Sequence, residues 1–150
     1  MAIGARTPVG LTAETAAAAV RARISRISEH PFLVDVRGER VRMARDGLLE
    51  PDLFGVPRMI ALARSALDEV LGKLGPRALG LRMTLLVGLP ELRPGWTERD
   101  VGAMEQELAL PPGFMGGKLH FMLGGHAATL ALLRQGWAGS KAVACLFTRL

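Results

Sequence analysis

The chain has one cysteine, no tyrosine and only three lysines among its 150 residues. The single cysteine, Cys145, excludes an internal disulfide and is typical of proteins from the reducing cytoplasm. No apolar run reaches the roughly 18 residues that a membrane-crossing helix needs, and residues 1–6 lack the charged and apolar segments of a signal peptide. We therefore expect a cytoplasmic protein without a membrane span.

Aromatic residues are also scarce, at 5% of the chain, and this bears on how the net charge of +5 is interpreted. A basic chain can indicate nucleic-acid binding. However, the densest basic cluster, residues 37–45, contains Glu39, is followed by Asp46 and includes no aromatic side chain that could stack on a base. We therefore do not expect nucleic-acid binding. The alternative hypothesis, that the chain binds nucleic acid, predicts an affinity for nucleic acid that falls steeply as the salt concentration rises.

Hydrophobic residues make up 49% of the chain and charged residues 22%, which is the balance of a globular protein. A chain of this length can bury a sizeable core as one domain. We find no internal repeat, and the only low-complexity stretch is the alanine run at 16–19. The sequence therefore predicts a single domain over residues 1–150.

Capping and turn signals divide the chain into alternating strands and helices. Thr12 is a suitable N-cap with Glu14 in the first turn, and Thr97 and Asp100 form a capping-box pattern. The clearest apolar stripe at helical spacing covers residues 60–74. The predicted helices are 12–27, 57–74, 97–108 and 126–135, the strands 2–5, 32–36, 40–43, 81–87, 119–123 and 142–147, and the turns or breaks 7–10, 30–31, 75–76 and 90–95. This alternation predicts an α/β fold with a mostly parallel sheet flanked by helices.

The predicted strand at 119–123 runs directly into Gly124, Gly125 and His126, where a helix is expected to begin. Such a turn places its residues beside free backbone N–H groups and the positive end of the helix dipole, and acyl-transfer enzymes hold their nucleophile there. The dipole disfavours protonated imidazole, so a neutral His126 could donate a hydrogen bond to a carbonyl, act as a weak base, or only cap the helix. Gly124 and Gly125 either permit close backbone approach or serve the tight turn alone.

The other histidines, the cysteine and the glycine-rich stretches give no sign of a further metal, catalytic or cofactor site. His120 and His126 are without a third ligand nearby in the sequence, so no metal site is expected. Cys145 lies among apolar residues and is expected to be buried and inert. His30 precedes a proline and is expected to be exposed. No phosphate-binding glycine-rich loop and no Gly-x-Ser-x-Gly turn is present, so no cofactor is predicted.

Four segments, in this order, resemble the N-terminal half of a β-ketoacyl synthase, which has the thiolase-like fold. Residues 4–14 are similar to the first strand, turn and first helix of that family, and residues 58–74 to the helix before its second strand. Residues 85–88 end in glycine as that second strand does, and residues 124–130 occupy the place of the nucleophile turn. The likeness covers nearly the whole chain and implies a thiolase-like half-fold in one truncated domain.

The resemblance implies an acyltransferase of fatty-acid or polyketide type that takes acyl thioesters from an acyl carrier protein. It places His126 at the catalytic position and Gly124 and Gly125 at the substrate, without metal or cofactor. Condensing members carry an acyl-accepting cysteine at that position. They place further histidines or an asparagine in a C-terminal half for which this chain has no counterpart. We therefore expect a degenerate pseudoenzyme with little or no condensing activity.

The alternative hypothesis is a non-catalytic interaction or scaffold module. Condensing enzymes of this fold dimerise by pairing the strand before the nucleophile, so the resemblance implies a homodimer through the strand Leu119–Leu123. A half-fold would also leave apolar helix and sheet surface for a partner of the same fold to cover.

Overall fold

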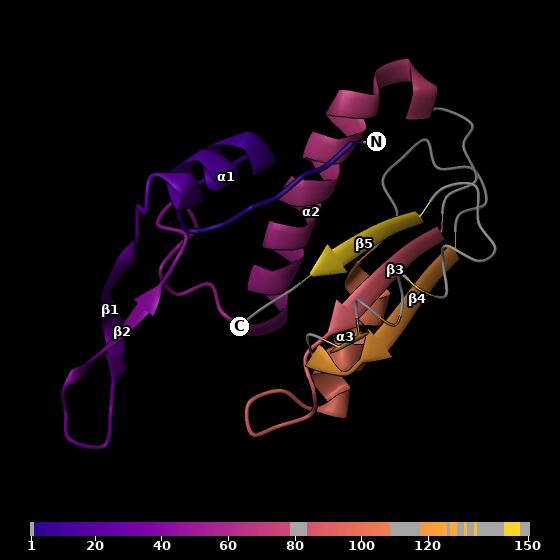
Figure 1. Ribbon diagram of the computed structural model, residues 1–150. Helices are drawn as coiled ribbons and strands as arrows, with labels where there is room; N and C mark the ends of the chain where they lie inside the picture. Colours follow the sequence, from indigo (N-terminus) through magenta and orange to yellow (C-terminus); the bar gives the residue numbers. More distant parts are fainter. Residues whose placement is uncertain are drawn as a thin grey trace.

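The computed structural model describes residues 2–78, 84–108, 118–125, 127–128, 131, 134 and 143–147. In chain order these residues form α1 (Ala13–Arg21), β1 (Ile27–Val34), β2 (Arg40–Ala44), α2 (Gly55–Leu74), the 3₁₀ turn η1 (Gly75–Ala78), β3 (Thr84–Leu89), α3 (Glu98–Glu107), β4 (Lys118–Leu123) and β5 (Val143–Phe147). The fold is mixed α/β, as predicted. Figure 1 shows the sheet of β3, β4 and β5 on one side of α2 and the β1–β2 hairpin with α1 on the other.

β3 is the middle strand of a three-stranded parallel sheet whose order is β4-β3-β5. Leu85 of β3 lies opposite Leu119 of β4 and Ala144 of β5. Every residue of β3 from Leu85 to Leu89 is buried, and the strand has a neighbour at each edge. This burial is what its nearly continuous apolar sequence predicts.

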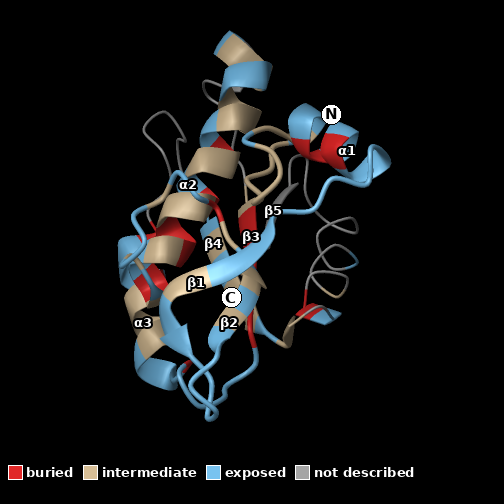
Figure 2. Ribbon diagram, turned by 90° about the vertical axis from the view of Figure 1, so that its left-hand side faces the viewer, coloured by how far each residue is buried: buried red, intermediate tan, exposed pale blue. Residues whose placement is uncertain are grey.

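α2 and α3 pack against one face of β3 and form the core with it. The apolar stripe predicted along α2 is confirmed at Ile60, Ala63 and Leu67, which are buried. α3 begins at the predicted capping box between Thr97 and Asp100. Figure 2 shows buried residues gathered on the inner sides of these elements. The core consists of Val56, Met59, Ile60, Ala63, Leu67, Leu85, Val87, Leu89, Trp96, Met104 and Leu108.

β1 and β2 form an antiparallel hairpin with Ile27 opposite Ala44. The Asp35 carboxylate stabilises its turn by accepting hydrogen bonds from the N–H groups of Arg37 and Glu39, at 2.8 and 2.9 Å. The predicted extended piece at 40–43 is therefore confirmed, and the piece predicted at 32–36 is confirmed at 32–34, where it forms the end of β1. β1 and β2 form a two-stranded sheet of their own rather than part of the parallel sheet, and most of the hairpin is exposed (Figure 2).

The prediction of a strand at residues 2–5 is wrong. These residues pair with no strand in the described part of the chain and run along α2 instead (Figure 1). A Cβ at Gly4 would overlap a backbone carbonyl oxygen of α2, so only a residue without a side chain permits this packing. The Glu69 carboxylate of α2 accepts hydrogen bonds from the N–H groups of Ala5 and Ala13, at 2.9 and 3.0 Å, and ties both the segment and α1 to α2.

The first helix also differs from its prediction, because it ends at Arg21 rather than at Ile27. Only two alanines of α1 are buried, so a longer apolar stripe would have no surface to pack against. Arg23 takes a positive φ of 55°, and Ile27 begins β1. Residues 30–31, predicted to break the helix, therefore lie inside a strand. Pairing with β2 outweighs the local helical pattern, as tertiary context often does.

The remaining predicted helices, strands and turns, apart from shifts at their ends, are present where the structure describes them. The turn at 7–10 is closed by reciprocal backbone hydrogen bonds between Thr7 and Gly10, and α2 ends at Gly75. The predicted residues 81–83 of the central strand lie outside the described residues. Among the helices that the structure describes, none combines the length and the apolar character that crossing a membrane requires.

Candidate functional site

The turn that follows β4 has the predicted strand-to-helix shape. Gly124 and Gly125 adopt positive φ values of 143° and 55°, a region of backbone conformation that glycine adopts readily and other residues rarely. The chain is helical at Gly125 and at Ala127 and Ala128. The N–H groups of these two alanines donate to the Gly124 carbonyl at 3.1 and 3.3 Å. A glycine turn followed by helical residues is therefore confirmed for the described part of this segment.

This glycine turn, Gly124–Gly125, lies at the carboxyl end of the parallel sheet. Leu123 at the end of β4 is level with Leu89 at the end of β3, and β5 runs in the same direction. Ligands of parallel α/β sheets bind beyond the carboxyl ends of the strands. The turn is thus well placed for a substrate. His126 lies outside the described residues, and its role stays a prediction.

The two other reactive residues of the sheet lie away from the glycine turn. His120 is exposed within β4, and Cys145 lies in β5, where its backbone is paired with Leu86. In the part of the chain that the structure describes, no group of three or more His, Cys, Asp or Glu side chains could hold a metal ion.

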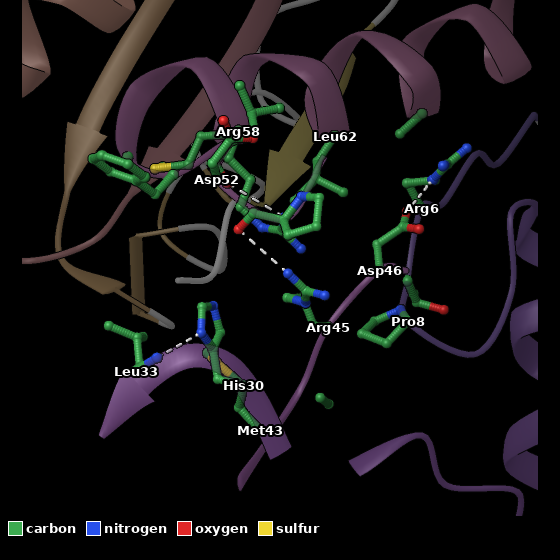
Figure 3. A pocket seen from close by; sticks show the side chains of 18 of the residues that line it. Arg6, Pro8, His30, Leu33, Met43, Arg45, Asp46, Asp52, Arg58 and Leu62 are labelled. Carbon is green, nitrogen blue, oxygen red and sulfur yellow. Dashed lines mark hydrogen bonds and ion pairs between the residues drawn. The ribbon is translucent and has the colours of Figure 1, made fainter. Parts of the chain in front are cut away.

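A second candidate site, which the sequence did not predict, is a cavity of about 670 Å³. It lies between residues 4–8, the β1–β2 hairpin and the start of α2, and we call it the hairpin cavity (Figure 3). Its volume falls within the range of roughly 300–1,000 Å³ that is usual for small-molecule sites. The apolar part of its lining includes Phe32, Leu33, Met43, Phe54, Met59 and Leu62. The charged part comprises Arg6, Arg45, Asp46, Asp52 and Arg58.

One pair of charges in the hairpin cavity is internally neutralised. The Nε of Arg6 donates to the carboxylate of Asp46, which is only 4% exposed. Burial by itself would raise the pKa of Asp46, but the hydrogen bonds from Arg6 and from the N–H of Leu48 outweigh burial and hold the pKa below its usual value. Asp46 is therefore ionised at neutral pH, with Arg6 as its counter-ion.

Two further guanidinium groups, of Arg45 and Arg58, lack such a partner. Their Nη1 atoms donate to the carbonyl oxygens of Pro51 and Leu53, at 3.3 and 3.5 Å. No carboxylate within the described residues forms an ion pair with either group. Burial and the nearby charge of Arg45 lower the pKa of Arg58, and the nearby carboxylate of Asp46 opposes them in part. The second of these causes means that the two positive charges lie close enough to repel each other.

His30 contributes to the same cavity and is half-buried, so the prediction that it is exposed is wrong. Its Nδ1 accepts hydrogen bonds from the N–H groups of Phe32 and Leu33, at 3.2 and 3.0 Å. Figure 3 shows His30 on the hairpin, below the side chain of Arg45. The cavity is thus lined by polar side chains from both the hairpin and α2.

The sequence offered no local signal for this cavity. Asp46 appeared only as the residue that follows a basic cluster, and Arg6 and Arg58 lie far from it along the chain. Comparison of the chain with protein-family models, with curated proteins and with solved structures finds no match. The glycine turn and the hairpin cavity therefore remain the two candidate sites of the described chain.

Proposed function

We propose that the chain is a β-ketoacyl synthase-like protein that binds acyl thioesters presented by an acyl carrier protein and does not condense them. The observation that supports this proposal is the glycine turn at the carboxyl end of β4. There β4 ends in a turn through Gly124 and Gly125, both with positive φ, and Ala127 and Ala128 beyond it are helical. A turn at this place agrees with the resemblance, because the β-ketoacyl synthase family holds its nucleophile in the turn after the corresponding strand. Thiolase-like ancestry is part of this proposal.

The residue that follows this turn is the reason for proposing an inactive protein. A condensing enzyme needs a sulfur nucleophile that ionises near a helix N-terminus and then acts as a leaving group. The histidine at position 126 supplies an imidazole instead. A neutral imidazole at this place can donate a hydrogen bond to a thioester carbonyl, but it does not replace the thiolate. The proposal is therefore thioester binding without turnover.

The test is a pair of measurements with an acyl carrier thioester. Titration calorimetry of the wild-type chain should show binding, and mass spectrometry should show neither acylated protein nor condensation product. In a Cys145→Ala background, the new thiol of His126→Cys should attack the thioester carbonyl and take the acyl group, while the carrier leaves as its free thiol. Ala127→Cys in the same background is the matched control and should acquire no acyl group.

Two results would overturn this proposal. Turnover by the wild-type chain that disappears in His126→Ala would show that the protein is an active enzyme. Absence of binding together with absence of acylation in His126→Cys would show that the turn does not receive thioesters.

The order of the parallel sheet supports a second proposal, in which the chain is an interaction module that dimerises. β4 is an outer strand of the three described strands, with β3 as its neighbour on one side. Backbone groups on the outer side of such a strand can pair with a second copy. Light scattering over a series of protein concentrations should then give twice the monomer mass. A monomer at every concentration would contradict the dimer through Leu119–Leu123.

A further inference from the structure

The hairpin cavity is lined by three arginines and two aspartates, so its lining has one positive charge in excess. Arg6 is paired with Asp46, whereas Arg45 and Arg58 donate only to backbone carbonyl groups at 3.3 and 3.5 Å within the described chain. Each guanidinium has five N–H donors in a planar fork, and most of these donors have no partner among the described residues. The remaining carboxylate of the lining, Asp52, is exposed and forms an ion pair with neither arginine.

Apolar side chains surround these two arginines. Phe32, Leu33 and Phe54 line the cavity although 68, 51 and 79% of their surface is exposed. Single exposed apolar residues are common on protein surfaces, whereas several at the mouth of one cavity indicate a binding surface. Met43 of the hairpin and Leu62 of α2 also line the cavity (Figure 3). An occupant with an apolar body would cover these side chains.

We propose that the hairpin cavity binds a carboxylate with an apolar tail, such as a medium-chain fatty acid. The carboxylate lies on Arg45 and Arg58, and the tail lies against Phe32, Leu33 and Phe54. A guanidinium binds a planar carboxylate through two parallel hydrogen bonds, and two such groups offset their mutual repulsion by sharing one anion. No residue of the glycine turn lines this cavity, so this proposal does not depend on the proposed function.

Three ligands with the same tail and different headgroups test the proposal. Decanoate, decyl phosphate and decanol are each titrated into the wild-type chain by calorimetry, below their aggregation concentrations. Decanoate should bind one to one, and decanol about tenfold more weakly or worse, because it lacks the charge that the arginines bind. Equal binding of decanol and decanoate would overturn the headgroup assignment. Tighter binding of decyl phosphate would show that the cavity prefers a phosphate and would overturn the choice of a carboxylate.

Matched variants separate the two arginines from the general positive charge of the chain. Arg45→Gln and Arg58→Gln should each weaken decanoate binding by about 10- to 100-fold, as expected for loss of a charge-assisted hydrogen-bonded pair. Arg42→Gln removes the same charge from an exposed position on β2 that does not line the cavity, and it should leave binding unchanged. Equal losses in all three variants would overturn the proposal.

Nuclear magnetic resonance of the wild-type chain gives an outcome that does not depend on variant folding. Decanoate should shift the amide resonances of the cavity lining, including those of Phe32 and Leu33. Shifts confined to residues outside the lining would contradict the proposal, even if Arg45→Gln or Arg58→Gln failed to fold by circular dichroism.

Discussion

Asp46→Asn should destabilise the protein by removing one partner of a largely buried ion pair. The side chains of Asp46 and Arg6 are 4% and 16% exposed, respectively. Breaking a fully buried pair costs about 3–5 kcal/mol, because the remaining charge is left without compensation. Solvent reaches the Arg6 side, which reduces this cost, and the new amide still accepts the hydrogen bond from Leu48. We therefore expect the free energy of unfolding to fall by about 2–3 kcal/mol at pH 7.

The effect should depend on pH in a defined direction. Because the pKa of Asp46 is lower in the folded chain than in the unfolded chain, the pair stabilises the protein above the unfolded pKa of about 3.9. This stabilisation is lost as the pH falls through the folded pKa. The difference between the wild-type chain and Asp46→Asn should therefore be full at pH 7 and should shrink in acid, where wild-type Asp46 becomes protonated.

Urea denaturation followed by circular dichroism at pH 7 and at several acidic pH values measures this difference. Asp52→Asn is the matched control, because Asp52 is exposed and forms no ion pair within the described chain. It should change the free energy of unfolding by about 0.5 kcal/mol or less. Equal effects of Asp46→Asn and Asp52→Asn at pH 7, or a difference that does not shrink in acid, would refute the reasoning.

Three further predictions concern how the chain is held together. Hydrogen bonds from Lys73 and from the N–H groups of Ala5 and Ala13 lower the pKa of Glu69 to about 2, against the effect of burial. Ionised Glu69 therefore stabilises the folded chain above about pH 4.3, and this stabilisation is lost as the pH falls toward 2. Glu69→Gln should lower the melting temperature at pH 7 and flatten its acid dependence; an unchanged profile would contradict this role. Gly4→Ala should lower the free energy of unfolding by about 1–3 kcal/mol in urea denaturation, because its Cβ would overlap a carbonyl oxygen of α2 and lie 2.9 Å from Val70 Cγ2. An unchanged free energy of unfolding would show that residues 2–5 do not pack on α2. Trp96 is buried, and its Nε1 has no hydrogen-bond partner among the residues that the structure describes. Trp96→Phe should therefore lower the free energy of unfolding far less than Trp96→Ala, which should cost roughly 3–5 kcal/mol in the same assay. Equal costs would argue against an unsatisfied donor.

The elements that the sequence predicted correctly carry their signals within a few residues. The apolar stripe of α2 and the capping box between Thr97 and Asp100 are local patterns, and local patterns act before any tertiary contact forms. The same holds for the glycine turn, because Gly124 and Gly125 adopt conformations that their own backbones permit. The α/β class followed from the order of these elements.

Tertiary structure decided what local patterns left open. Residues 2–5 have the composition of a strand, but a strand also needs a partner, and contacts with α2 hold this segment instead. The apolar pattern at helical spacing continues to Ile27, but α1 ends at Arg21 because the residues from Ile27 onward pair with β2. The hairpin cavity depends most on the fold. Its ion pair joins Arg6 to Asp46, and Arg58 comes from another element, so no window of sequence contains the site. Burial and electrostatic pairing arise between distant segments, and only folding brings those segments together.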